Sequence, residues 1–129
     1  MDFNFKEKFK PNQNAKEEFL KTLESKGKNK SNIKCAKIEH SRIDYEKNQD
    51  DETKFIEKSA LLKINFTDEE YEQFLKDLDF DYYSGYGGQE LFGIVLFNDN
   101  SWLERGEYDG SEWWEYKECP KIPKDCLRE

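Results

Sequence analysis

The segment from Leu91 to Lys117 constrains the fold most, because two turn signals divide it into three stretches of strand length. Residues 91–97 are apolar at both alternating sets of positions, which is typical of a strand in the centre of a sheet. Residues 98–101 predict a turn, and Asp109-Gly110 between alternating residues is a strong hairpin signal. Strands over 91–97, 102–108 and 112–117 are therefore predicted to form an antiparallel meander.

Two earlier segments predict strands of the same sheet. Residues 33–43 have the pattern of a strand in which Ala36 and Ile38 share a face. Residues 54–66 alternate between apolar and polar, as expected for an antiparallel sheet that is covered on one side. The apolar side chains of this alternation are Ile56, Ala60, Leu62, Ile64 and Phe66. The polar residues 44–53 between the two strands predict a surface loop.

Two amphipathic helices are predicted, each with a capping signal at its start. Asn14 followed by Glu17 predicts a helix over 14–26, and Thr67 followed by Glu70 predicts another over 68–78. Residues 79–90 predict a glycine-rich loop. The order is α-β-β-α-β-β-β, which indicates an α+β fold with two helices packed on one face of an antiparallel sheet.

The 129 residues suffice for a single domain with one modest core, which we expect over 1–129 with loose ends at 1–11 and 120–129. Charged residues make up 39% of the chain, but the 16% that are aromatic can supply the core. The net charge of -8 is uneven, since residues 51–129 carry 9 basic and 20 acidic side chains. Nucleic-acid binding depends on Lys and Arg, so the acidic half favours a basic protein surface as its partner over direct nucleic-acid binding.

No residue pattern predicts a cofactor or a catalytic centre. Cys35, Cys119 and Cys126 lack the spacing of a zinc site, and His40 is expected to be an ordinary surface or edge residue. The glycine cluster at 85–88 follows a helix and precedes a strand, the reverse of the order in phosphate loops. The first residues do not have the pattern of a signal peptide, so none is expected, and the sequence contains no 18-residue apolar run. We therefore expect a cytoplasmic protein with no membrane segment, metal, cofactor or enzymatic activity.

Aromatic and acidic residues are densest on the last two predicted strands. Trp, Tyr and Arg are common at the centres of protein interfaces, and surrounding carboxylates suit a basic partner. Trp113 and Trp114 must point to opposite sides of the sheet, so the tryptophans are either core residues or contact residues. The candidate partner-binding residues are Trp102, Glu104, Arg105, Glu107, Tyr108, Asp109, Glu112, Trp113, Trp114 and Tyr116.

Two other functions stay open on the sequence alone. A metal-dependent hydrolase would use the strand carboxylates, which are Glu104, Glu107, Asp109, Glu112 and Glu115. Strand alternation places Glu104 and Glu107 on opposite faces, which disfavours that function. A small nucleic-acid-binding regulator would use the lysines between Lys21 and Lys37.

Three segments resemble a family of short proteins encoded by tailed phages and prophages: residues 89–93 (QELFG), 102–116 (WLERGEYDGSEWWEY) and 120–123 (PKIP). The resemblance extends over Leu61 to Pro123, with a departure at the turn 98–101, where the family pattern has Asp-Gly. It implies a bacterial host cell as the setting and carries no particular activity with it. Small acidic phage proteins often bind and block host machinery. The resemblance thus implies a stoichiometric inhibitor of the anti-CRISPR type, directed at a host defence or nucleic-acid-processing complex such as a CRISPR-associated nuclease.

Overall fold

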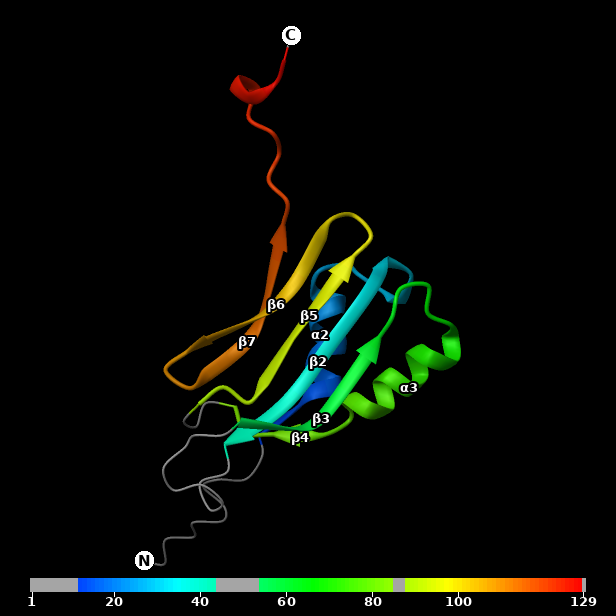
Figure 1. Ribbon diagram of the computed structural model, residues 1–129, viewed down its shortest axis with the longest axis vertical. Coiled ribbons are helices and arrows are strands. Elements are labelled where there is room, and N and C mark those ends of the chain that lie inside the picture. The colour runs from blue at the N-terminus through cyan, green and yellow to red at the C-terminus, as the bar shows by residue number, and fades with distance from the viewer. Residues whose placement is uncertain (1–11, 44–53, 85–87, 129) are drawn as a thin grey trace, which may run out of the picture.

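The computed structural model describes residues 12–43, 54–84 and 88–128, and its largest element is a five-stranded antiparallel sheet (Figure 1). The strands are β2 (Ile33–Ile43), β3 (Lys54–Leu62), β5 (Leu91–Phe97), β6 (Ser101–Tyr108) and β7 (Ser111–Glu118). They lie in the order β3-β2-β5-β6-β7, with β5 in the centre as predicted. The α+β class and the C-terminal three-stranded meander are therefore confirmed.

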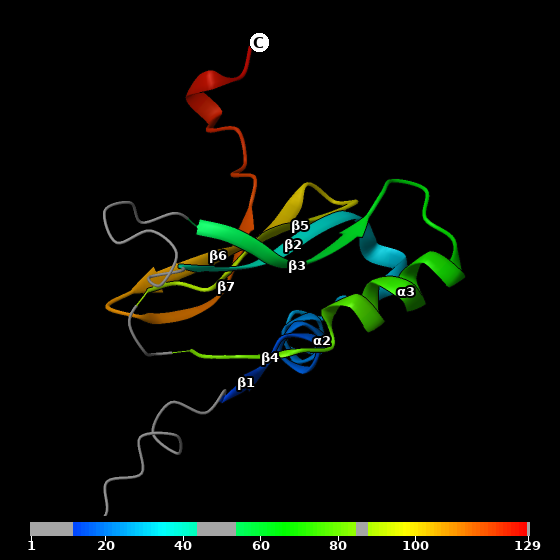
Figure 2. The ribbon, with the colours of Figure 1, turned by 60° about the horizontal axis from the view of Figure 1, so that its bottom comes forward.

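Both long helices, α2 (Ala15–Ser25) and α3 (Asp68–Leu78), lie on one side of this sheet (Figure 2). The opposite side, which we call the open face, carries no helix of the described chain. Strand alternation and burial assign to the open face the side chains of Cys35, Lys37, Glu39, Leu61, Phe92, Ile94, Leu96, Trp102, Glu104, Tyr108, Trp113, Glu115 and Lys117.

The predicted capping residues start both helices. The Asn14 side chain accepts a hydrogen bond from the backbone N–H of Glu17 at 2.9 Å. Thr67 and Glu70 each accept from the other's backbone N–H at 3.1 Å, which completes a capping box. These bonds satisfy N–H groups that the first helical turn leaves without partners, so the helices begin within a residue of the predicted positions.

The core fills the space between the helices and the sheet. The rings of Phe19 on α2 and Phe74 on α3 meet edge to face, with their centroids 5.5 Å apart. The other large side chains that are almost fully buried are Tyr82, Ile38, Leu62, Leu78, Leu91, Leu103 and Val95. The core therefore combines aliphatic side chains with aromatic rings, two of which come from the helices.

The segment 79–90, predicted as a loop, contains the short strand β4 (Asp81–Tyr82), which pairs with β1 (Gln13–Asn14). Strands of two residues produce no periodicity, so the sequence gives no signal for them. Their pairing ties the start of α2 to the end of α3. A single 3-10 turn, η1 (Lys30–Asn32), connects α2 to β2.

Strand β3 ends four residues earlier than predicted. Asn65 adopts a left-handed backbone with φ of 59°, and Ile64 is exposed instead of joining the buried face. The prediction was therefore wrong for Ile64, because alternation stops where the backbone leaves the extended region. Phe66 stays half-buried, with its ring 5.9 Å from that of Tyr71.

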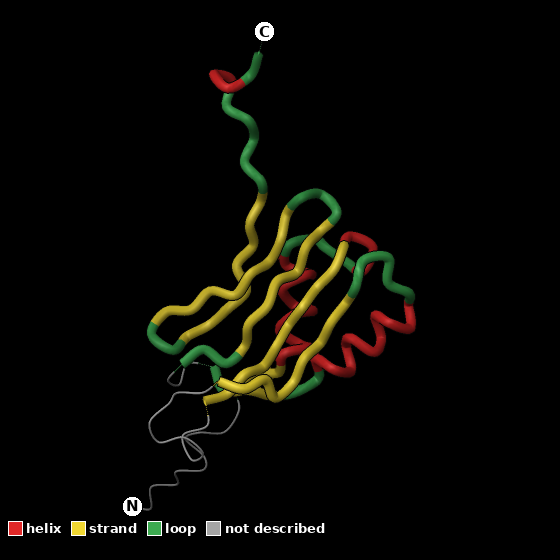
Figure 3. The backbone as a smooth tube through the Cα atoms, in the orientation of Figure 1, coloured by secondary structure: helices red, strands yellow, loops and turns green. Residues whose placement is uncertain are grey.

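Residues 119–128 leave the end of β7 and extend away from the sheet, with a short 3-10 turn η2 (Lys124–Cys126) near their end (Figures 1 and 3). Every one of these residues is exposed. The segments 1–11, 44–53 and 85–87, for which an end, a loop and part of a glycine cluster were predicted, lie outside the described residues. Within the described part of the chain, neither helix is long and apolar enough to cross a membrane.

Candidate functional site

The ten candidate contact residues divide between the two sides of the β6–β7 hairpin. The register pairs Glu104 with Glu115 and Arg105 with Trp114, so neighbouring residues on each strand point to opposite faces. Trp102, Glu104, Tyr108 and Trp113 lie on the open face, whereas Arg105, Glu112, Trp114 and Tyr116 face the helices, and Glu107 and Asp109 lie at the exposed hairpin end. Trp113 and Trp114 therefore point to opposite sides, as the alternation requires.

Trp113 lies on the open face beside a glycine of the neighbouring strand. A Cβ atom at Gly106 would lie 2.7 Å from Trp113 Nε1 and 2.8 Å from Glu115 Oε1, so the glycine leaves space for both side chains in these positions. The indole N–H of Trp113 donates to Glu115 Oε1 at 3.2 Å. Trp113 remains 39% exposed, which makes its aromatic side chain available to a partner.

Aliphatic side chains from other strands extend this surface across the sheet. The register places Leu61, Lys37, Ile94, Glu104 and Glu115 in one cross-strand row. Leu61 and Ile94 are exposed large hydrophobic residues, and the sequence analysis missed both as contact candidates. The signal for Ile94 was present in the apolar run 91–97, but a run that is apolar at all positions suggests burial on both faces. Leu61 is an apolar residue among the polar alternate positions of 54–66.

The hairpin presents more carboxylates than ammonium groups. On the open face, Glu104 and Glu115 lie beside one lysine, Lys117, and Glu107 and Asp109 add negative charge at the exposed hairpin end. Lys117 Nζ lies 2.6 Å from Glu104 Oε1 and 3.8 Å from Glu115 Oε2, so one ammonium serves two carboxylates. Charge at this surface therefore complements a basic partner.

The hairpin end is a tight turn that presents an aromatic residue. Asp109 and Gly110 both have positive φ, at 52° and 86°, as the Asp-Gly signal predicts for a type I′ turn. Glu107 Oε1 accepts from the backbone N–H of Gly110 at 2.9 Å. Tyr108 is 77% exposed, which places the most accessible ring of the hairpin beside its acidic end.

Arg105, Glu112 and Trp114 are removed from the expected contact surface by burial. Arg105 Nη2 donates to Glu112 Oε1 at 2.6 Å, and its guanidinium lies 4.9 Å from the centroid of the Trp114 ring. Glu112 also accepts from the backbone N–H groups of Glu90 and Leu91 at 2.8 and 3.0 Å. These hydrogen bonds connect β6 and β7 to the start of β5. Tyr116 is partly buried and packs against the core.

The buried charges continue to α2 and β4. Arg105 Nη1 donates to Glu18 Oε1 at 3.1 Å, and the Tyr82 hydroxyl donates to the same oxygen at 2.5 Å. Burial raises the pKa of Tyr82, so its hydroxyl stays protonated. Burial disfavours the Arg105 cation, but the carboxylates of Glu18 and Glu112 outweigh burial and raise the pKa of Arg105. The charged Arg105 guanidinium therefore lies between two carboxylates and connects β6 and β7 to α2 and β4.

His40 is not the surface or edge residue that was expected. It is buried on the inner strand β2, where its Nε2 lies 2.9 Å from Glu90 Oε1 and its ring packs against Phe80. Sequence spacing gave no sign of this pair, because the two residues are 50 positions apart. The described residues contain no cluster of three metal-ligating side chains, and all three cysteines are free thiols.

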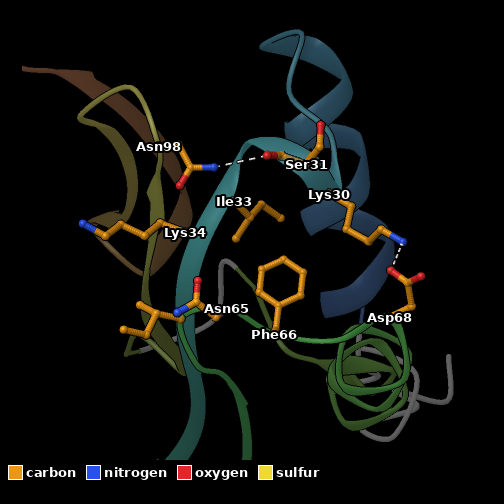
Figure 4. A pocket seen from close by; sticks show the side chains of 9 residues that line it. Lys30, Ser31, Ile33, Lys34, Asn65, Phe66, Asp68 and Asn98 are labelled. Atoms are coloured by element: carbon orange, nitrogen blue, oxygen red, sulfur yellow. Dashed lines mark hydrogen bonds and ion pairs between the residues drawn. The ribbon is translucent and has the colours of Figure 1, made fainter.

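Three of the six lysines from Lys21 to Lys37, namely Lys28, Lys30 and Lys37, form ion pairs with carboxylates of the described chain. Lys28 Nζ lies 2.6 Å from Asp99 Oδ2, and Lys30 Nζ lies 2.7 Å from Asp68 Oδ1. Lys30 also borders a cleft of about 580 Å³ between η1 and the β3–α3 connection (Figure 4). The pairing reduces the positive charge that these lysines could offer to phosphate groups.

Comparison of the chain with protein-family models, with curated proteins and with solved structures gives no match.

Proposed function

We propose that this protein acts by stoichiometric binding to another protein, and that the contact is the open face together with the β6–β7 hairpin end. The observation that supports this most is the exposure of Trp113, Tyr108, Ile94 and Leu61 on the side of the sheet without helices. These side chains share the face with the charged residues Lys37, Glu104 and Glu115, and exposed apolar residues gathered on one face are typical of interaction sites.

The composition of this surface matches the anatomy of protein interfaces. Tryptophan and tyrosine contribute most of the binding energy in many interfaces, because they bury a large area with few rotatable bonds. Trp113 lies beside Gly106, and its indole N–H donates a hydrogen bond to Glu115. The side chain therefore loses little conformational entropy when a partner covers it.

The acidic hairpin favours a partner with a basic surface. Opposite charge across an interface accelerates encounter and suppresses wrong partners. A basic groove that binds nucleic acid has the required charge, and covering it would block its nucleic acid. Together with the resemblance to short phage proteins, this supports inhibition of a host defence or nucleic-acid-processing complex, such as a CRISPR-associated nuclease.

The test is affinity capture from a bacterial extract with three versions of the immobilised chain, read by quantitative mass spectrometry. The face variant combines Trp113→Ala with Glu115→Lys. The control variant combines Leu20→Ala with Glu72→Lys on the helical side, where Leu20 is 38% exposed and Glu72 is also exposed. Both variants remove one exposed apolar side chain and change the charge equally.

The proposal expects a protein that the wild type and the control variant retain and the face variant loses by at least about tenfold, the effect of losing one interface anchor. A protein retained equally by all three versions would contradict the proposed surface. Salt-dependent binding of an oligonucleotide, with no protein retained, would favour the nucleic-acid-binding alternative instead.

A further inference from the structure

The described residues after β7 form no backbone hydrogen bonds with the strands of the sheet. Residues 119–128, here called the arm, project away from the body in both orientations of the ribbon (Figures 1 and 2). The arm's hydrogen bonds with described residues are local, from Cys126 N to Pro123 O at 2.9 Å and from Leu127 N to Lys124 O at 3.1 Å. Pro120 and Pro123 restrict the backbone and favour an extended course.

The arm carries the chemistry of a ligand for an acidic apolar surface. Ile122 and Leu127 are 66% and 57% exposed, although both are large hydrophobic residues. The arm also contains three basic residues, Lys121, Lys124 and Arg128, against one acidic residue, Asp125. An exposed segment of this kind leaves apolar area in water that a complementary surface can cover.

The open face offers the complementary features. Trp113, Ile94 and Leu61 supply exposed apolar area, and Glu104 and Glu115 share a single lysine. An extended arm of ten residues reaches about 33 Å, whereas five strands span about 19 Å from first to last. The arm is therefore long enough to cross the whole face.

We infer that the arm of one copy of this protein docks on the open face of a second copy. Reciprocal exchange of two arms gives a closed dimer, in which each arm covers the other copy's face. Docking on its own face would require the chain to reverse direction directly after β7, at the two prolines that keep it extended. This inference goes beyond the proposed function, because the dimer requires only the open face and the arm of this protein and no other partner.

Sedimentation equilibrium of the full chain over a range of concentrations and salt tests this dimer. The arm variant is Ile122→Asp with Leu127→Asp, and the face and control variants are those of the capture experiment. We expect a dimer that weakens with added salt, and a dissociation constant at least about tenfold higher in the arm and face variants than in the control. A monomer at all concentrations, or an arm variant that dimerises as tightly as the wild type, would overturn the inference.

Cross-linking identifies which copy the arm contacts. In a Cys35→Ser background, a thiol-reactive photo-cross-linker is attached to Cys119 and Cys126, both exposed on the arm, in a mixture of isotopically heavy and light copies. Cross-links from the arm to residues 102–117 are expected between heavy and light copies. Cross-links only within one copy would show that the arm lies on its own sheet and would overturn the dimer. Capture of the partner by the arm variant distinguishes the dimer from the proposed function. The arm variant should lose the dimer but still retain the partner protein, because its open face is unchanged.

Discussion

At the scale of single residues, Arg105 and Glu112 form the most buried of the ion pairs between described residues, with side chains 2% and 0% exposed. A buried pair is not a large source of stability, because desolvation offsets most of the attraction. Glu112 nevertheless accepts three hydrogen bonds, one from the Arg105 guanidinium and two from backbone N–H groups. Removing it leaves those donors buried without an acceptor.

Glu112→Ala is accordingly expected to lower the free energy of unfolding by about 3–5 kcal/mol. Glu115→Ala, on the same strand but on the open face, is expected to change it by less than about 1 kcal/mol. Urea unfolding of both variants checks this difference. Equal losses for the two variants would contradict the structural role of the buried pair.

Gly93 is a second residue whose identity follows from packing. A Cβ atom there would lie 2.6 Å from the backbone oxygen of Lys37, which cannot move without shifting β2. Gly93→Ala is expected to destabilise the fold by about 1–3 kcal/mol, the usual cost of overpacking. Gly88→Ala, where a Cβ atom meets nothing within 4 Å, is the matched control and is expected to be close to neutral. Thermal unfolding of the two alanine variants measures the contrast.

At the scale of elements, the β5–β6 turn is fixed to the end of α2 by charge. Asp99 accepts from Lys28 and from the Ser101 backbone, and its pKa is lowered, first by the Lys28 hydrogen bond and then by those from Ser101. A carboxyl whose folded pKa is depressed stabilises the fold above its unfolded value of about 3.9. That contribution is lost as the pH falls from that value through the folded pKa.

Asp99→Asn is therefore expected to be less stable than the wild type at pH 7, and the difference should narrow as the pH falls below about 4. Denaturant unfolding at pH 7 and at successively lower pH values measures this difference. Asp125→Asn, in the exposed arm, is the control and should follow the wild type at every pH. A constant difference between wild type and Asp99→Asn across this range would rule out the carboxylate as its source.

At the scale of the whole molecule, the sequence predicted the long elements well, because turn signals, alternation and capping boxes each act locally. Helix α3 and strand β2 have the predicted bounds, and the meander follows from Asp109-Gly110. The pairing of His40 with Glu90 and the burial of Arg105 depend on contacts between distant segments, which local patterns do not encode. For the same reason, alternation indicated that Trp113 and Trp114 face opposite sides but not which side is open.

The central claim is that the open face binds the partner, and side-chain footprinting of the captured complex tests it most directly. Hydroxyl radicals oxidise exposed aromatic side chains, so Trp113 and Tyr108 should react in the free monomer, while the buried Trp114 serves as an internal reference. The account predicts that Trp113 and Tyr108 become protected in the complex while exposed Leu20, on the helical side, keeps its reactivity. Unchanged oxidation of Trp113 and Tyr108 in the complex, with protection of the helical side, would contradict it.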